Sequence, residues 1–331
     1  MFKDKKILIT GGTGSLGTAL TKRLLQEDVD TIRIYSRDEW KQTQMESDLR
    51  EDRLRFLIGD VREKERLSRA LEDIDIAIHA AALKHVPVAE YNPFEAVKTN
   101  VLGAQNLIEC CIDNQVDVAL AISTDKAVSP LNTYGATKLL MERLFVSKDY
   151  SSFRHKIKTM CVRYGNVLGS RGSVVPTFVN QILTGKKITI TDNSMTRFNI
   201  TMNQSIDLVL RALEKKISGS ILVPKLKSYR VEDLKDAIIE IFGANNEYEK
   251  INPRPGEKFH EVLINHHEIR NAYELDNDYV LFDKDNNFLN QAEASFLKSA
   301  NLTDQYSSDK MPYLTKDELK KILLKENLIP K

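Results

Sequence analysis

Short apolar runs of β type, separated by segments of helical length, constrain the fold of this chain more than any other feature. The runs lie at residues 6–10, 31–35, 54–58, 74–78, 118–122, 160–164 and 221–223. The clearest segment between them begins at Asn92-Pro93, a pair typical of a helix start. Its apolar side chains recur near the helical period, at Phe94, Val97, Val101, Ala104, Ile108 and Ile112. Strand, helix and strand in repetition predict a doubly wound α/β fold with a parallel sheet.

The rhythm changes after residue 164. Residues 165–200 are rich in Gly, Ser, Thr, Pro and Asn, which predicts loops and short strands. Residues 201–224 return to a helix and a strand, and residues 226–331 are charged with amphipathic helices. We therefore expect two interleaved parts: a larger one of residues 1–167 and 201–225, and a smaller one of residues 168–200 and 226–331.

Composition excludes several classes of protein. The 331 residues include 48 Lys and Arg against 47 Asp and Glu, so no nucleic acid or anionic membrane is expected as a partner. No apolar stretch approaches the roughly 20 residues of a membrane span. The three cysteines, two of them adjacent, argue against a disulfide framework, and the histidines show no metal-type spacing with them. The chain is expected to be soluble and cytoplasmic, with no metal site.

A glycine pattern directly follows the first β run. Glycine lets the backbone approach a pyrophosphate, and the start of the following helix offers free N–H groups. Because the pattern lies between a strand and a helix, it predicts a dinucleotide-binding turn. The expected contacts are Gly11, Thr13, Gly14, Ser15, Leu16 and Gly17.

The residues after the second β run bear on the type of dinucleotide. An acid there would hold a ribose 2′-hydroxyl, as in NAD enzymes, whereas an arginine favours a 2′-phosphate. Arg37 directly follows the run, so NADP is favoured, and Asp38 can instead cap the next helix. The other cofactor contacts expected beside them are Ser36, Lys41, Asp60, Val61 and Ala81.

A possible catalytic group follows the fifth β run, and it consists of Thr124, Tyr134 and Lys138. Tyr134 and Lys138 are spaced i,i+4, so they share one face of a helix. A lysine cation there, beside a nicotinamide ring, would favour tyrosinate and make Tyr134 a base. Thr124, at the end of the run, can hydrogen-bond the same substrate hydroxyl.

Ordered motifs along nearly the whole chain resemble the extended short-chain dehydrogenase/reductase family, and within it the configuration-inverting UDP-N-acetylglucosamine 4,6-dehydratases. They are TGGTGSLG (10–17), HAAALKHVPVAEYNP (79–93), STDKA (123–127), YGATK (134–138), RYGNVLGSRGSVVP (163–176), ITDNSMTRF (190–198) and RPGEKFHE (254–261). The resemblance implies a Rossmann sheet in residues 1–167 and 201–225 that binds NADP, and a nucleotide-sugar region in residues 168–200 and 226–331. It also implies a homo-oligomer, for which a hexamer is one candidate.

The pair after Thr124 separates this group from its neighbours. Asp125-Lys126 resembles the inverting dehydratases, whereas retaining dehydratases carry Asp-Glu and 4-epimerases carry small, non-acidic residues. The resemblance implies that Tyr134 takes the 4-hydroxyl proton, Lys126 removes the C5 hydrogen, and Asp125 protonates the departing 6-hydroxyl. Lys126 needs a lowered pKa for this, with burial and a neighbouring cation such as Lys138 as candidate causes. The division of roles between Asp125 and Lys126 stays open.

The expected product is UDP-2-acetamido-2,6-dideoxy-beta-L-arabino-hex-4-ulose, for bacterial surface sugars such as pseudaminic acid. Arginines suit the diphosphate of the substrate because their forks pair with phosphate oxygens. The expected substrate contacts are Lys84 (shared with the cofactor), Asn166, Arg171, Val174, Val175, Pro176, Thr177, Phe178, Arg197, Arg254 and Glu257. Structural alternatives exist for some of these contacts. Arg197 can form a salt bridge, and the segment from Arg254 to Glu257 can form a turn at Pro255-Gly256. His85 is expected to be structural.

Two other functions remain open. One is an isomerase, either a UDP-hexose 4-epimerase or a dehydratase with added epimerase activity. The other is a non-catalytic nucleotide-binding protein, against which the presence of both Tyr134 and Lys138 argues.

Overall fold

One large sheet organises the computed structural model, which describes residues 1–147, 157–170, 172–253, 256–282 and 297–330. Among these residues its strand order is β15-β13-β14-β9-β6-β5-β4-β1-β2-β3. The parallel strands are β1 (Lys6–Thr10), β2 (Thr31–Ser36), β3 (Leu54–Ile58), β4 (Ile76–His79), β5 (Val118–Ile122), β6 (Lys158–Val162) and β9 (Ser220–Pro224). The chain order reverses between β1 and β4, as in a doubly wound sheet. The predicted fold class is confirmed.

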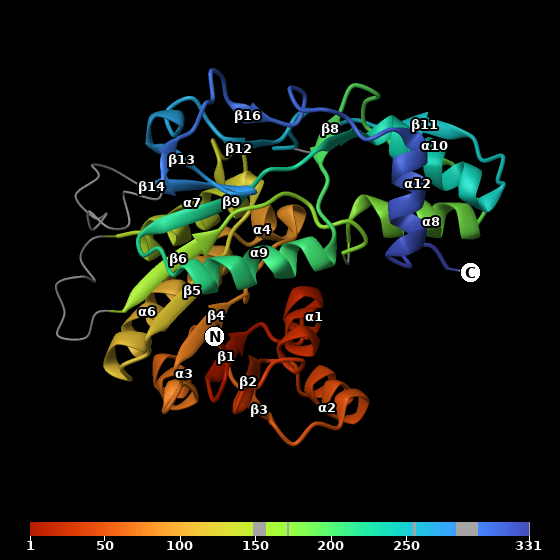
Figure 1. Ribbon diagram of the computed structural model, residues 1–331. Coiled ribbons are helices and arrows are strands. Elements are labelled where there is room, and N and C mark those ends of the chain that lie inside the picture. The colour runs from red at the N-terminus through yellow and green to blue at the C-terminus, as the bar shows by residue number, and fades with distance from the viewer. Residues whose placement is uncertain (148–156, 171, 254–255, 283–296, 331) are drawn as a thin grey trace.

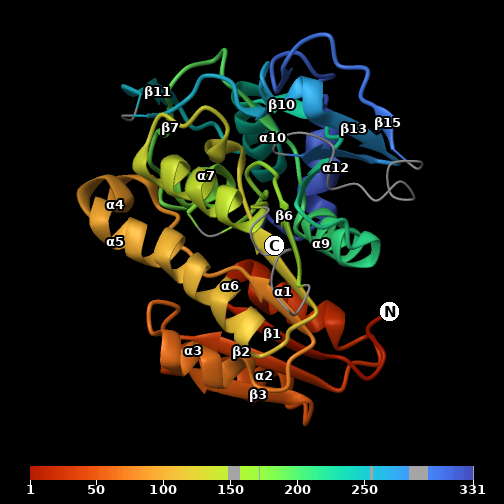
Figure 2. The same cartoon turned by 90° about the vertical axis from the view of Figure 1, so that its left-hand side faces the viewer.

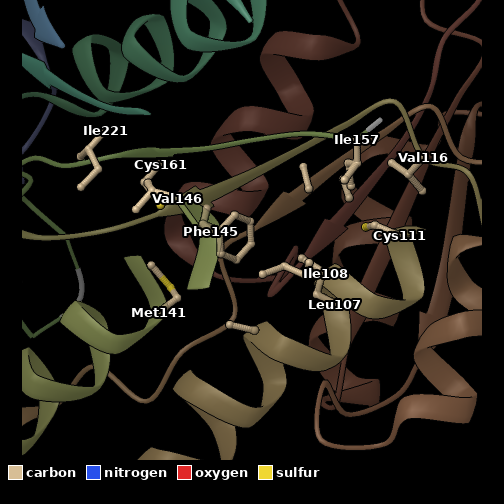
Figure 3. Close-up of a cluster of buried hydrophobic side chains, with 14 of the residues drawn as sticks. Leu107, Ile108, Cys111, Val116, Met141, Phe145, Val146, Ile157, Cys161 and Ile221 are labelled. Atoms are coloured by element: carbon tan, nitrogen blue, oxygen red, sulfur yellow. The ribbon is translucent and has the colours of Figure 1, made fainter. Parts of the chain in front are cut away.

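Helices cover both faces of this sheet. On one face α1 (Ser15–Leu24), α2 (Glu39–Leu49) and α9 (Met202–Lys215) share an apolar core with β1 and β2. On the other lie α3 (Lys64–Leu71), α6 (Gly103–Asp113) and α7 (Thr133–Phe145). Figure 3 shows that second core, where Leu107 and Ile108 of α6 and Phe145 of α7 gather near Cys161 of β6. All three cysteines are free and buried.

The helix predicted from residue 92 contains an interruption. It consists of α5 (Pro93–Val97), a π-helical turn (Lys98–Leu102) and α6, preceded by α4 (Val86–Tyr91). The wider turn shifts the helical phase, because a π turn holds one residue more than an α turn. Phe94, predicted on the apolar face, is therefore 64% exposed.

The C-terminal part contributes to the large sheet as well as to a smaller layer. β14 (Asp278–Phe282) pairs antiparallel with β9 and continues to β13 (Ala272–Leu275) and β15 (Lys298–Ser299). The sheet thus extends beyond residues 1–167 and 201–225, and its last three strands are antiparallel. The sequence did not predict this, because hairpin strands added at an edge leave no helical segment between them.

A second layer lies at one end of the sheet (Figure 1). It packs α8 (Val174–Leu183), α10 (Val231–Phe242) and α12 (Lys316–Lys325) around their own apolar core. Its short strand pairs are β8 (Thr196–Phe198) with β10 (Ser228–Arg230), β7 (Ile188–Ile190) with β11 (Tyr248–Lys250), and β12 (Val262–Ile264) with β16 (Tyr306–Ser307). The helix α8 corrects the prediction of loops and short strands across residues 165–200. Among the described residues no helix is long and apolar enough to cross a membrane.

Candidate active site

A cavity of about 980 Å³ opens between the carboxyl ends of the parallel strands and the second layer. The turn between β1 and α1 forms one wall of it. Gly11 has φ +66°, and a Cβ there would lie 2.8 Å from the Cα atom of Ala81. A Cβ at Gly17 would lie 2.6 Å from the Cα atom of Gly12. Only glycine fits these two positions. The N-cap residue of α1 is Gly14, so the N-terminus of this helix faces the cavity without a side-chain cap.

All the predicted residues of this turn line the cavity, as do those after β2 and β3 and the small Ala81. Asp38 caps α2 by accepting a hydrogen bond from the Lys41 N–H (3.1 Å), and its other oxygen pairs with the Lys41 ammonium (2.5 Å). This is the capping alternative that the sequence left open. The Arg37 side chain stays 59% exposed, 3.6 Å from a carboxylate oxygen of Asp60.

The predicted catalytic residues meet on the opposite wall. Thr124 lies two residues after β5 and caps a 3-10 turn (Asp125–Ala127), and Tyr134 lies in the first turn of α7. Gly135 allows α7 to approach this turn, because a Cβ there would overlap the carbonyl oxygen of Lys126. The Thr124 hydroxyl donates to Asp125 (2.8 Å), and Lys126 Nζ lies 3.1 Å from the same carboxylate oxygen.

The environment of Tyr134 differs from the expectation. Burial raises the pKa of Tyr134 to about 12, and the cation that opposes this is Lys126. Lys138 is buried with Nζ 3.1 Å from the sulfur of Met141, and burial lowers the pKa of Lys138 to about 8. In this structure the cation with the larger effect on Tyr134 is thus Lys126, and Lys138 lines the same cavity.

The structure does not show the lowered pKa that Lys126 needs as a base. Burial lowers the pKa of Lys126, but Asp125 and Glu261 together outweigh burial and raise it above the ordinary value of a lysine. Lys126 Nζ also donates to Asn166 Oδ1 at 3.0 Å. Without a change in its surroundings, Lys126 is an ammonium ion at neutral pH.

The two carboxylates beside Lys126 differ in access. Asp125 is 1% exposed and is absent from the cavity lining, behind Thr124 and Lys126. Glu261 lines the cavity, with Oε1 3.6 Å from Lys126 Nζ. Sequence reasoning missed Glu261, although it closes the quoted motif of residues 254–261.

The predicted substrate contacts divide into two groups. Lining the cavity are Lys84, Asn166, Val174, Thr177, Phe178, Arg197 and Glu257. Val175 is fully buried in the core of the second layer, and Pro176 is absent from the lining. Both lie on α8, where only one helical face can point to the cavity. Arg171 and Arg254 lie outside the described residues.

Arg197 is held mainly by protein groups. It donates to the carbonyl oxygens of Thr196 (2.8 Å) and Phe259 (3.0 Å) and lies 3.7 Å from Glu257 Oε1. The salt-bridge alternative therefore describes its contacts, while its side chain still reaches the cavity wall.

Two further residues shape the site. Asn100, in the π-helical turn, exchanges hydrogen bonds with the backbone of Leu83 (2.8 and 3.0 Å) and donates to Thr137 of α7 (2.9 Å). It thus fixes the loop that carries Lys84 against the helix that carries Tyr134. His85, expected to be structural, is the N-cap residue of α4 and also lines the cavity.

Comparison with known protein families agrees with this arrangement. The model of a family described as polysaccharide biosynthesis protein matches residues 7–282, which include the glycine turn and the 3-10 turn. The chain belongs to this family. Within it, the chain is 45% identical to a UDP-N-acetylglucosamine 4,6-dehydratase (inverting) of Campylobacter jejuni, over 98% of each protein. It is also 43% identical to a UDP-glucose 4-epimerase of Rickettsia akari, over 98% of this chain and 96% of that protein.

Solved structures resemble this family member, one of them along its whole length. The X-ray structure of Pen from Bacillus thuringiensis is 39% identical and aligns with a TM-score of 0.91 over 100% of both chains. A UDP-glucuronic acid 4-epimerase from Bacillus cereus, in complex with UDP-glucuronic acid and NAD, is 26% identical. It aligns with a TM-score of 0.69 over 77% of this chain and 88% of that one. The resemblance predicted from the motifs is confirmed.

Proposed function

We propose that this protein is a UDP-N-acetylglucosamine 4,6-dehydratase that inverts C5 and uses NADP. The observation that carries the proposal is the lining of one cavity by the glycine turn, Tyr134 and Lys126. In this arrangement a hydride acceptor, a hydroxyl and an amine can face the same sugar ring. The Campylobacter relative, whose name states this activity, supports the choice of substrate.

The residues around the glycine turn fit a dinucleotide. A side chain on Gly11 or Gly17 would fill the space that the pyrophosphate needs, and the first N–H groups of α1 point to it. A bound nicotinamide would supply hydride transfer, accepting hydride from C4 and returning it to C6. The Bacillus cereus structure holds NAD, which supports a nicotinamide dinucleotide.

The choice of NADP rests on charge at the end of β2. Lys41 and the N–H groups at the start of α2 already hold the carboxylate of Asp38. Arg37 and Lys41 both line the cavity, so a 2′-phosphate would meet two cations there.

The chain's own groups then divide the proton transfers. Tyr134, once it has lost its own proton to solvent, receives the 4-hydroxyl proton. Lys126, once neutral, removes the hydrogen at C5 as a proton, which the adjacent ketone acidifies. Asp125 is a buried carboxylate, so it first takes up the proton that Lys126 removed from C5. It then supplies this proton to the departing 6-hydroxyl through Lys126 or Thr124, its side chain's hydrogen-bond partners. A proton that comes from solvent then adds to the opposite face of C5 and inverts the centre.

The substrate's diphosphate is assigned to the second layer. Thr177 and Arg197 of that layer line the cavity, and so does Asn166. Arg171 and Arg254 are proposed as diphosphate ligands because arginine forks pair with phosphate oxygens. Residues 1–167 and 201–225 would hold the cofactor, and residues 168–200 and 226–331 the nucleotide sugar.

We also infer the setting of the reaction. The enzyme acts in the cytoplasm as a homo-oligomer, with a hexamer as one candidate, and makes precursors of surface sugars such as pseudaminic acid. The family description, polysaccharide biosynthesis protein, supports the pathway class.

A second function is a UDP-hexose 4-epimerase. The relatives of that name at 43% identity favour it. An epimerase needs no base for C5, so it gives no role to Lys126 at the cavity wall. Incubation with UDP-N-acetylglucosamine in heavy water, followed by NMR of the product, separates the two functions. The dehydratase gives a 4-keto-6-deoxy sugar with deuterium and inverted configuration at C5, and the epimerase gives a C4 epimer without deuterium.

Replacing Lys126 tests the proposed base. Lys126→Ala should abolish deuterium incorporation at C5, because no other assigned group removes that hydrogen. NADP should still bind, since the glycine turn and Arg37 are untouched. NMR of the recovered sugar measures the exchange, and calorimetry measures NADP binding as the control. Incorporation at the wild-type rate would contradict the role of Lys126.

A further inference from the structure

Glu261 places a second buried carboxylate at Lys126. The residue is 3% exposed, with Oε1 3.6 Å from Lys126 Nζ and 3.8 Å from Arg197 Nε. Its other oxygen, Oε2, is buried without a hydrogen-bond partner among the described residues. Burying a carboxylate oxygen unpaired is costly, so its position calls for a compensating interaction with nearby charge.

The backbone of Glu261 is held independently of Lys126. Its N–H donates to the hydroxyl of Ser308 (2.9 Å), and its carbonyl accepts from the Ser308 N–H (2.8 Å). The same hydroxyl is hydrogen-bonded to Thr196 of β8 (2.7 Å). The fold therefore presents the carboxylate to Lys126 from the second layer, and a change at Lys126 would not release it.

We propose that Glu261 is a positioning residue, which with Asp125 holds the Lys126 ammonium at the cavity wall and sets the pH at which Lys126 becomes a base. The inference rests on the proposed function, because it takes Lys126 as the base for C5. Asp125 directly precedes Lys126 in the 3-10 turn, and Glu261 approaches Lys126 from the segment before β12. Two flanking carboxylates hold an ammonium in position and also favour its charged form.

The other groups that bear on Lys126 come from several elements. The titratable and charged groups that interact with it are Asp125 of the 3-10 turn, Tyr134 of α7, Arg197 of β8, Tyr229 of β10, and Lys258 and Glu261 before β12. Within this set, Asp125 and Glu261 raise the pKa of Lys126 and Arg197 lowers it. Removing the charge of Glu261 therefore lowers the pKa of Lys126.

The lower pKa of Lys126 in a variant without the Glu261 charge should shift the pH dependence of C5 exchange. The rate of C5 exchange rises with pH as Lys126 loses its proton, because only the neutral amine is a base. Glu261→Gln keeps the size of the side chain but removes its charge, so the rise should move to lower pH by about one unit or more. Glu261→Asp keeps the charge but withdraws it by one methylene, so a smaller shift in the same direction is expected.

The experiment measures deuterium incorporation at C5 of UDP-N-acetylglucosamine, with NADP present, across a range of pH. It compares the wild type with both Glu261 variants and with Glu268→Gln as the matched control. Glu268 is a carboxylate from the segment after β12, but it pairs with Arg163 (2.8 Å). Its replacement should lower the melting temperature and leave the pH profile in place, as a purely structural effect would.

The outcomes separate the inference from the proposed function. A wild type that forms no 4-keto-6-deoxy sugar contradicts the proposed function. An active wild type whose pH profile moves in neither Glu261 variant overturns the role of Glu261 alone. If Glu261→Gln fails to fold, Glu261→Asp decides, and a profile that coincides with the wild type overturns the inference.

Discussion

At the scale of single residues, the hydroxyl of Tyr134 is the group with the most direct test. Its pKa is raised to about 12 by burial, so it carries its proton in the resting structure. Tyr134→Phe keeps the ring and removes the proton carrier. Turnover should fall by about 10²- to 10⁴-fold, the usual contribution of a general acid or base. Steady-state kinetics measure the loss, and calorimetry with UDP should show little change in affinity. Turnover at the wild-type rate would remove Tyr134 from the mechanism.

Arg37 tests the choice between the two dinucleotides. Arg37→Ala removes a cation whose side chain is 59% exposed, so little packing is lost. NADP should bind about tenfold more weakly or worse, a change of about 1.4 kcal/mol, while NAD affinity stays nearly constant. Titration calorimetry with each cofactor measures both. Equal weakening of NAD and NADP would show that Arg37 does not read the 2′-phosphate.

At the scale of elements, local patterns could be predicted and irregular ones could not. The strands around Gly11 and Thr124 follow from apolar runs, and the glycine turn follows from spacing within a few residues. The π-helical turn could not be predicted, because the apolar residues before it follow the ordinary helical period. The one extra residue of the turn then shifts the phase of the residues that follow. As a result, Phe94 was placed on the buried face, and the position of Asn100 beneath the active-site loop was missed.

Adding a single methyl group at Gly17 tests the role of the turn between β1 and α1 in cofactor binding. Gly17→Ala would bring its Cβ within 2.6 Å of the Gly12 backbone, which cannot yield as a flexible side chain would. The helix must shift, so we expect weaker NADP binding by more than tenfold and a loss of about 1–3 kcal/mol in the free energy of unfolding. Gly185→Ala is the control, because nothing lies within 4 Å of that position and only its φ of +65° is unfavourable. Calorimetry and denaturant unfolding measure the two effects. Unchanged NADP affinity in Gly17→Ala would contradict this account of the turn.

At the scale of the whole molecule, the site depends on contacts between distant parts of the sequence. Lys126 follows β5, whereas Glu261 and Arg197 come from the second layer. Sequence reasoning placed Arg197 at the substrate but could not see its bonds to Phe259 or the approach of Glu261. Such contacts depend on how the second layer packs over the sheet, and no period or spacing encodes that packing. The two carboxylates that raise the pKa of Lys126 therefore could not be identified together from the sequence.

The prediction of a homo-oligomer also concerns the whole molecule. Tyr91 at the end of α4 and Phe94 at the start of α5 are 88% and 64% exposed, on adjacent helices at one side of the molecule (Figure 2). Neighbouring large apolar side chains exposed in this way are typical of protein interfaces. Tyr91→Ser combined with Phe94→Ser should therefore lower the mass in solution, because each removes apolar area that a second copy would bury. Light scattering after size-exclusion chromatography measures the mass. Trp40→Ser is the control, since Trp40 is 70% exposed on α2, elsewhere on the surface, and its loss should leave the mass unchanged. If the double variant keeps the wild-type mass, the subunits meet through another face.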